Sequence, residues 1–124
     1  MRIFKTKWLA RFAKHEGIAD SNLREAVARA ERGLIDADLG GGLIKQRVAR
    51  RGKGRSGGYR MLIAHRLVNR AVFLYGFAKN ERDNIDGDEL ATLKEIAAVW
   101  LSADTAKIER AIAEGLLVEV KYEI

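Results

Sequence analysis

Residues 45–82 read KQRVARRGKGRSGGYRMLIAHRLVNRAVFLYGFAKNER, and this stretch decides the fold. It contains two nearly continuous apolar runs, which are typical of central strands buried on both faces of a sheet. They predict strands over residues 59–67 and 71–77, joined by a tight turn at residues 68–70. Just before them, Leu43–Arg50 alternates in character, with Ile44, Gln46 and Val48 on one side and Lys45, Arg47 and Ala49 on the other. This period of two predicts a third strand.

The same stretch holds nearly all of the excess positive charge. It carries 11 basic side chains and one carboxylate, Glu81, whereas the rest of the chain carries 12 basic and 16 acidic side chains. Cations gathered on a strand-forming segment indicate a surface for phosphate groups. The alternative is a solvated basic face without a partner. The alternation of these cations with core residues favours the first interpretation.

Strand geometry predicts where the cations meet. The period of two places Lys45 and Arg47 on one face of their strand. Arg60 opens the next strand and Lys79 follows the one after it, and these ends lie close together in an antiparallel pair. We therefore expect Arg60, Lys79, Lys45 and Arg47 to gather at one end of the sheet.

Residues 51–58, RGKGRSGG, are predicted to form a glycine-rich loop. Its four glycines would allow backbone N–H groups to approach a phosphate closely. The alternative is an ordinary hairpin loop. The cations Lys53 and Arg55 inside the segment favour phosphate binding.

Length and composition predict one domain over residues 1–124, with a core at about 1–101 and a helix-and-strand extension at 102–124. The chain has no cysteine and two histidines, so we expect no disulfide, no metal site and no cofactor. Neither a secretory signal nor a membrane-spanning run is recognisable, which predicts a cytoplasmic protein without a membrane partner.

Two helices are predicted before the basic stretch. Trp8, Leu9, Phe12 and Ala13 recur at helical spacing and indicate a helix over Lys7–Glu16, which would end at Gly17. The second helix would start at Asp20 or Ser21 as N-cap and stop at Gly33. Both helices would cover a sheet. Lys7, Arg11 and Lys14 of the first helix, and Lys5 just before it, could contact phosphates. Simple solubility explains these basic residues equally well.

The remaining segments complete the prediction. A short strand is suggested at residues 2–5, and residues 40–42, three glycines, would be a flexible joint, not a P-loop. After residue 84 acidic residues dominate. Helices are predicted from an N-cap at Asp88 to about residue 101 and over residues 104–114. Residues 116–124 alternate like an edge strand, which could also receive a partner.

The order of the motifs in the basic stretch resembles the RelE/ParE superfamily of bacterial toxin–antitoxin toxins, most of all its RelE/HigB-like branch. The matching pieces cover about 45 residues and are RVA at 47–49, GKG at 52–54, SGGYR at 56–60 and KNER at 79–82. The resemblance implies a small α+β fold, in which an N-terminal helical pair packs on an antiparallel sheet and C-terminal helices follow.

The resemblance also implies an activity and partners. RelE-like members cleave mRNA on the ribosome without a metal, using the 2′-OH of the RNA as nucleophile. A cognate antitoxin, often a helix-turn-helix protein, neutralises the toxin. Two alternatives stay open: a ParE-like inhibitor of DNA gyrase, and a non-catalytic nucleic-acid-binding module.

The resemblance implies catalytic roles for the residues at matching motif positions. These are Arg60 at the scissile phosphate, Lys79 in charge stabilisation or proton transfer, and Lys53. A lysine can act as a base only where burial or nearby cations depress its pKa. RNA-binding roles fall on Lys45, Arg47, Arg50, Arg51, Arg55, Tyr59, Asn80 and Arg82.

The chain departs from the family pattern in one region. The best-known nucleases have a base-stacking tyrosine after the strand-end motif, whereas here residues 84–86 are Asn-Ile-Asp, and Asn80 replaces a common arginine. The catalytic set can therefore differ. Tyr59 or His65 are candidates to contribute, although each is also explained as an ordinary residue of the sheet.

Overall fold

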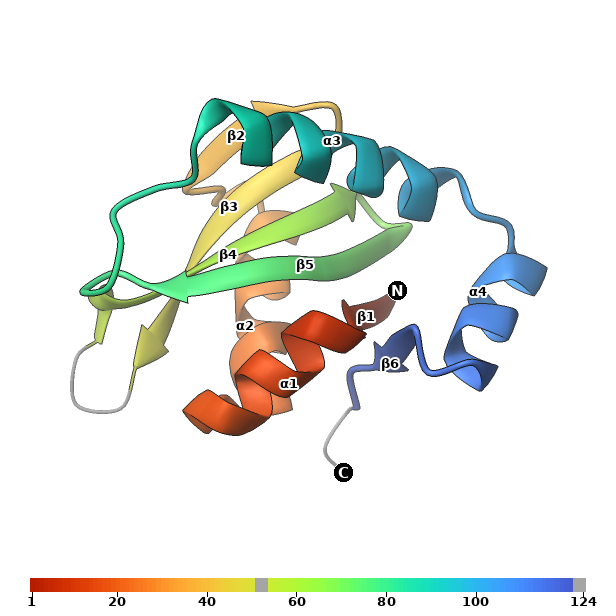
Figure 1. Ribbon diagram of the computed structural model, residues 1–124, viewed down its shortest axis with the longest axis horizontal. Coiled ribbons are helices and arrows are strands. Elements are labelled where there is room, and N and C mark those ends of the chain that lie inside the picture. The colour runs from red at the N-terminus through yellow and green to blue at the C-terminus, as the bar shows by residue number, and fades with distance from the viewer. Residues whose placement is uncertain (51–53, 122–124) are drawn as a thin grey trace.

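The computed structural model describes residues 1–50 and 54–121. The described residues form an α+β fold, as predicted (Figure 1). In chain order its elements are β1 (Arg2–Thr6), α1 (Lys7–Glu16), α2 (Asp20–Glu31), β2 (Ala37–Gly40), β3 (Leu43–Arg50), β4 (Gly54–Arg66), β5 (Arg70–Ala78), α3 (Gly87–Ser102), α4 (Thr105–Ala113) and β6 (Leu117–Glu119).

The strands form one open sheet in the order β2-β3-β4-β5-β1-β6. The two most apolar strands, β4 and β5, lie inside the sheet and β6 lies at its edge, as expected from their sequences. The pairing is antiparallel except between β1 and β5, which run parallel with Arg2 opposite Arg70. The parallel pair was not predicted, because a few residues at the start of a chain carry no signal for a distant partner.

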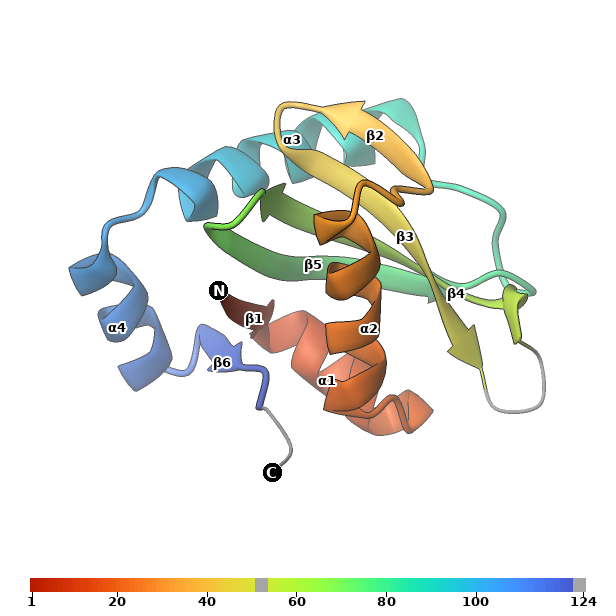
Figure 2. The same cartoon turned by 180° about the vertical axis from the view of Figure 1, so that it is seen from behind.

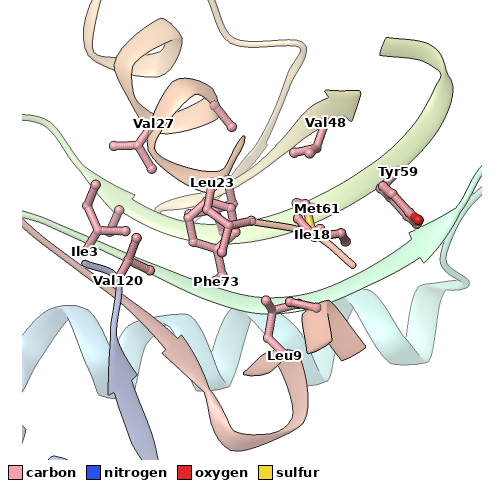
Figure 3. Packing of buried hydrophobic residues seen from close by; sticks show 14 of the residues in the cluster. Ile3, Leu9, Ile18, Leu23, Val27, Val48, Tyr59, Met61, Phe73 and Val120 are labelled. Atoms are coloured by element: carbon pink, nitrogen blue, oxygen red, sulfur yellow. The ribbon is translucent and has the colours of Figure 1, made fainter. Parts of the chain in front are cut away.

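Each face of the sheet has its own hydrophobic cluster. On one face, side chains such as Leu9 of α1 and Leu23 of α2 pack against Phe73 and Met61 of the central strands (Figure 3). The other face is covered by α3 and α4, and Figure 2 shows α2 and α3 crossing the sheet on opposite sides. The strict alternation of β3 divides its side chains between the faces, so Ile44 and Val48 lie in the first cluster.

Several predicted details are confirmed and others are wrong. Gly17 has the left-handed φ of 71° expected of a helix C-cap. The predicted N-caps of two helices are displaced: α2 begins after Ala19, and Asp86 rather than Asp88 caps α3. Asp20 does not cap because its carboxylate accepts hydrogen bonds from Lys5 Nζ at 2.7 Å and from the backbone N of Lys121 at 3.0 Å.

Two predicted loops are more regular than expected. Residues 40–42 do not form a flexible joint. They form the tight turn of the β2–β3 hairpin, and all three glycines have positive φ, which other residues adopt only at a cost. The predicted loop over residues 51–58 is wrong from Gly54 onward, since β4 begins there. Conversely, the strand predicted over residues 116–124 is described only at Leu117–Glu119.

Trp8 departs from its predicted place in the core. Helical spacing grouped it with Leu9 and Ala13, which are buried, but 45% of Trp8 is exposed. The helix turns its apolar stripe toward the sheet through these other two positions, so Trp8 lies at the margin of that stripe.

Candidate nucleic-acid interface

The register of the strands places several basic residues on the face of the sheet that α3 covers in part. Arg47 of β3 lies directly opposite Arg60 of β4, which in turn lies opposite Phe77 of β5. Directly opposed residues point to the same face of a sheet. Lys79 follows Phe77 by two positions, and its backbone N donates to Gly58 O at 2.9 Å. The ends of β4 and β5 therefore meet, as the sequence predicted.

Three of the cations line one pocket. It has a volume of about 240 Å³ and is bounded by Asp36, Ala37, Lys45, Arg47 and Arg60. Lys79 lies outside this lining. The convergence of Lys45, Arg47 and Arg60 matches the geometry expected from strand periodicity, while their roles stay predictions.

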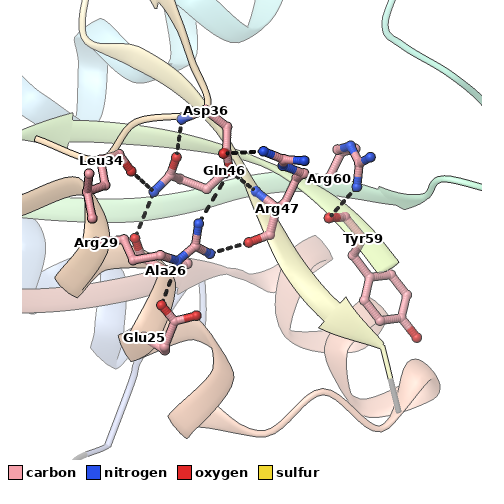
Figure 4. A network of polar contacts seen from close by, with 9 residues as sticks. All are labelled: Glu25, Ala26, Arg29, Leu34, Asp36, Gln46, Arg47, Tyr59 and Arg60. Atoms are coloured by element: carbon pink, nitrogen blue, oxygen red, sulfur yellow. Dashed lines mark hydrogen bonds and ion pairs between the residues drawn. The ribbon is translucent and has the colours of Figure 1, made fainter. Parts of the chain in front are cut away.

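A carboxylate that the sequence analysis did not single out organises this pocket. The Asp36 carboxylate accepts a hydrogen bond from the backbone N of Arg47 at 2.7 Å. It also forms an ion pair with Nη2 of the Arg47 side chain at 3.1 Å (Figure 4). Arg47 is thereby held by both its backbone and its side chain. Its guanidinium lies beside Arg60 in a fixed direction.

A buried amide holds Asp36 in turn. Gln46 is fully buried, and its Oε1 accepts from the backbone N of Asp36 at 2.7 Å. Its Nε2 donates to Ala26 O at 2.9 Å and to Leu34 O at 3.2 Å, so every polar atom of the amide has a partner. The signal was present in the sequence, because Gln46 occupies an inward position between Ile44 and Val48.

Arg29 completes the support from the helix side. Only 6% of this residue is exposed. Its Nε donates to Glu25 at 2.6 Å, its Nη1 contacts Asp36 at 3.4 Å, and its Nη2 donates to the backbone carbonyl of Arg47. A buried guanidinium needs several such acceptors to offset its desolvation. This arginine ties α2 to the strand that carries the pocket.

The charges in the pocket influence one another. Burial alone would raise the pKa of Asp36, but the hydrogen bonds from Arg47 and the nearby positive charges outweigh it, and the pKa lies below its usual value. Burial, with a smaller effect from Arg47, lowers the pKa of Arg60. An arginine starts so far above neutrality that Arg60 stays a cation. The pocket therefore presents fixed positive charge.

Two cations of β3, Lys45 in the pocket and Arg50 at the end of the strand, contact neutral acceptors. Lys45 Nζ lies 3.3 Å from Asn84 Oδ1, and Arg50 Nη1 lies 3.4 Å from Asn80 Oδ1. An amide oxygen orients a cation without cancelling its charge. These side chains can therefore still attract a phosphate.

The strand-end motif at residues 79–82 contains two cations, Lys79 and Arg82, and both form ion pairs with carboxylates. Lys79 pairs with Asp83 at 3.1 Å on the surface. Arg82 pairs with Glu89 at 2.5 Å, lies 5.3 Å from the centre of the Phe77 ring and donates to the Tyr75 hydroxyl at 3.3 Å. These contacts favour a structural role for Arg82, which joins the strand end to α3.

Tyr59 and His65 lie away from the pocket. Only 2% of Tyr59 is exposed, within the cluster on the α1 and α2 face, where its hydroxyl donates to Glu16 at 3.0 Å. His65 lies near the other end of β4 and contacts Glu31 at 2.6 Å. Neither side chain reaches the pocket, so we leave both out of the proposed site.

The remaining predicted residues are placed as follows. Arg51 and Lys53, the latter a catalytic candidate, lie outside the described residues. Arg55 lies in β4. Within residues 1–50 and 54–121, no three His, Cys, Asp or Glu side chains are grouped so that they could bind a metal ion. Over the same residues, no helix has the length and apolar character needed to cross a membrane.

Comparisons with known proteins address the family. A search of curated proteins found no match to this chain. A family profile described as "RelE toxin of RelE / RelB toxin-antitoxin system" matches residues 1–120. This match does not distinguish the RelE/HigB-like branch, which stays a prediction. Since the profile covers nearly all of the chain, and the α+β fold agrees with it, the chain belongs to the RelE toxin family, whose members are toxins with a cognate antitoxin.

Proposed function

We propose that this toxin is an endoribonuclease that cleaves mRNA on the translating ribosome. The observation that supports this proposal best is the pocket formed by Lys45, Arg47 and Arg60. It presents cations from two strands at one point, with a carboxylate that fixes the direction of one of them. Such an arrangement fits a phosphodiester better than an extended protein surface.

The proposed reaction uses the RNA itself as nucleophile. The 2′-oxygen forms a bond to the adjacent phosphorus while the bond from phosphorus to the 5′-oxygen breaks. The products are a 2′,3′-cyclic phosphate and a free 5′-hydroxyl. One proton leaves the 2′-OH and one is delivered to the 5′-oxygen, and negative charge grows on the phosphoryl oxygens between these events.

The pocket would stabilise that growing charge. Arg60 would donate to a non-bridging oxygen of the scissile phosphate, and Arg47 would offer a second planar donor beside it. A preorganised donor of this kind contributes about 3–4 kcal/mol to the transition state. Lys45 would hold the RNA backbone at the rim. We assign Lys79, on the same face, to charge stabilisation or proton transfer.

Induced expression in bacteria tests the proposal. We expect growth arrest, with primer extension on a translated message showing cuts inside codons. Arg60→Ala should lower the cleavage rate by about 10²–10³-fold and relieve the arrest. Lys79→Ala should also relieve toxicity. Arg110→Ala is the matched control, because Arg110 is exposed on α4 and has no side-chain hydrogen bond or ion pair within the described residues.

Other outcomes would redirect the assignment. Full toxicity of both Arg60→Ala and Lys79→Ala, with folded proteins, would overturn the proposed site. Cuts in messages that are not translated would indicate a free ribonuclease. Growth arrest with damaged DNA and intact messages would indicate inhibition of gyrase.

The antitoxin would cover the same basic surface. We propose an acidic or amphipathic partner, with a helix-turn-helix domain as in related systems. The product of an adjacent small reading frame should co-purify with the toxin and protect messages from cleavage. Failure of that product to bind would leave the antitoxin to be sought elsewhere on the genome.

A further inference from the structure

Trp8 is an exposed aromatic side chain in a fixed orientation. It lies in the first turn of α1 and is 45% exposed. Its ring stacks on Phe12 of the same helix, with centroids 5.2 Å apart and an angle of 13° between the planes. It also lies 4.5 Å from the ring of Tyr75 on β5. Two aromatic neighbours thus hold the indole in place while part of it remains open.

The surroundings of this ring are basic. Arg11 follows Trp8 by three positions, which places it near the indole on the helix surface, and Lys7 directly precedes Trp8 in the chain. Both side chains are exposed, and within the described residues neither makes a hydrogen bond or an ion pair. An aromatic ring interleaved with uncompensated cations is typical of surfaces that bind single-stranded nucleic acid.

The contacts of Tyr75 connect this surface to the cationic pocket. The Tyr75 hydroxyl accepts from Arg82 Nη1 at 3.3 Å, and Arg82 lies over the ring of Phe77. Phe77 lies directly opposite Arg60 in the sheet. Trp8, Tyr75, Arg82 and Phe77 are therefore successive neighbours, and the strand register places Arg60 beside Phe77 at the far end of the series.

We propose that Trp8 stacks on a base of the bound RNA while Lys7 and Arg11 contact its phosphates. This inference rests on the proposed function and adds a base-binding position to it.

Nearby carboxylates limit the path of the RNA. Tyr75, Asp88, Glu89, Thr92 and Leu93 line a pocket of about 320 Å³ on the α3 side. The Glu89 carboxylate is occupied by Arg82, but Asp88 is exposed and would repel phosphate. The phosphates would therefore follow the α1 side, where the cations lie. The base alone would contact the indole.

Tryptophan fluorescence provides the test, because the chain has two tryptophans, Trp8 and the half-buried Trp100. The purified full chain is titrated with a 2′-O-methyl RNA dodecamer, which lacks the nucleophilic hydroxyl. We expect the emission to be quenched on binding. Trp100→Phe should keep the quenching, whereas Trp8→Phe should lose it and still bind, because a phenyl ring also stacks.

Affinity gives a second measurement. Trp8→Ala should weaken binding of the dodecamer by about 5- to 150-fold, the range that corresponds to the loss of one base–aromatic stack. Trp100→Phe should bind like the parent protein. Melting curves of each variant establish that a weaker affinity does not come from unfolding.

The outcomes separate this inference from the proposed function. If Trp8→Ala binds the dodecamer as tightly as the parent protein while Arg60→Ala does not, the stacking position is wrong and the cationic pocket stands. Absence of quenching in the parent protein at dodecamer concentrations that saturate binding would also overturn it. If Trp8→Ala instead loses only the co-purifying antitoxin, Trp8 belongs to a protein interface.

Discussion

Asp36 determines the direction of the guanidinium that lies next to Arg60. Its carboxylate contacts the backbone and the side chain of Arg47 and also meets the buried Arg29. A cationic pocket without such a counter-charge would spread its side chains into solvent. At this scale, one acidic residue among basic ones makes the site more ordered at the expense of one unit of positive charge.

The lowered pKa of Asp36 predicts how stability depends on pH. Because the folded protein binds the proton less tightly than the unfolded chain, Asp36 contributes stability above the unfolded value of about 4. That contribution disappears as the pH falls through the folded value. Asp36→Asn should therefore lower the melting temperature at pH 7 and make little difference near pH 2.

Thermal melts across this pH range measure the effect. Asp88→Asn is the control, since Asp88 is exposed and its side chain makes no hydrogen bond or ion pair within the described part of the chain. An Asp36→Asn variant that melts below the parent protein by the same amount at every pH would contradict the prediction.

At the level of elements, α3 is attached to the sheet at both ends by arginines. Arg82 holds its N-terminal turn through Glu89. At the other end, Arg70 Nη1 donates to Trp100 O and Ala103 O at 2.7 Å each, and Arg66 Nη1 donates to Leu101 O at 2.9 Å. Positive charge at a helix C-terminus offsets the unpaired carbonyls and the helix dipole.

Removing one of these caps should loosen the helix. Arg70→Met keeps much of the aliphatic stem and loses both hydrogen bonds, so we expect the free energy of unfolding to fall by about 1–3 kcal/mol. Arg110→Met, on the surface of α4, should change it by less than about 0.5 kcal/mol. Urea denaturation measures both. Equal stabilities of the two variants would show that the cap contributes nothing.

The elements that the sequence predicted are those with local signals. The bounds of α1 and β3 follow from apolar spacing, and the central place of β4 and β5 follows from their apolar runs. The short strand β2 was missed because an alternation over only four residues is too short to be distinguished from chance. The site was predictable where strand alternation decides it, as for Lys45 and Arg47. The contacts of Asp36 depend on how the β2–β3 hairpin joins the sheet, and the exposure of Trp8 depends on how α1 packs on it. Local sequence patterns do not predict either of these.

The whole molecule is strongly polarised in charge. Of its net charge of +6, the basic stretch supplies the excess, and carboxylates dominate the remainder. Such a distribution attracts a polyanion to one region and turns the rest of the protein away from it. Binding through phosphates releases counterions, so we expect the proposed affinity for RNA to fall as salt concentration rises.

The salt dependence can be assigned to single cations. For single strands, the logarithm of the binding constant falls against the logarithm of salt concentration with a slope of about −0.7 for each phosphate contact. Lys45→Ala should therefore reduce the slope by about 0.7, measured with the uncleavable dodecamer. Lys107→Ala, on the surface of α4, should leave it unchanged. An unchanged slope in Lys45→Ala would remove Lys45 from the interface.

The position of β1 has a consequence for how the chain is made. Phe4 pairs with Val72 on one side and with Glu119 on the other, so β1 is synthesised before both of its neighbours and is enclosed only when β6 follows. Translation at about 5–20 residues per second leaves it without its outer neighbour for roughly 6 to 23 seconds. A nascent chain of this toxin therefore spends that interval with the outer edge of β1 unpaired. Any ribosome that stalls before β6 emerges retains a sheet in which β1 is an uncovered edge strand.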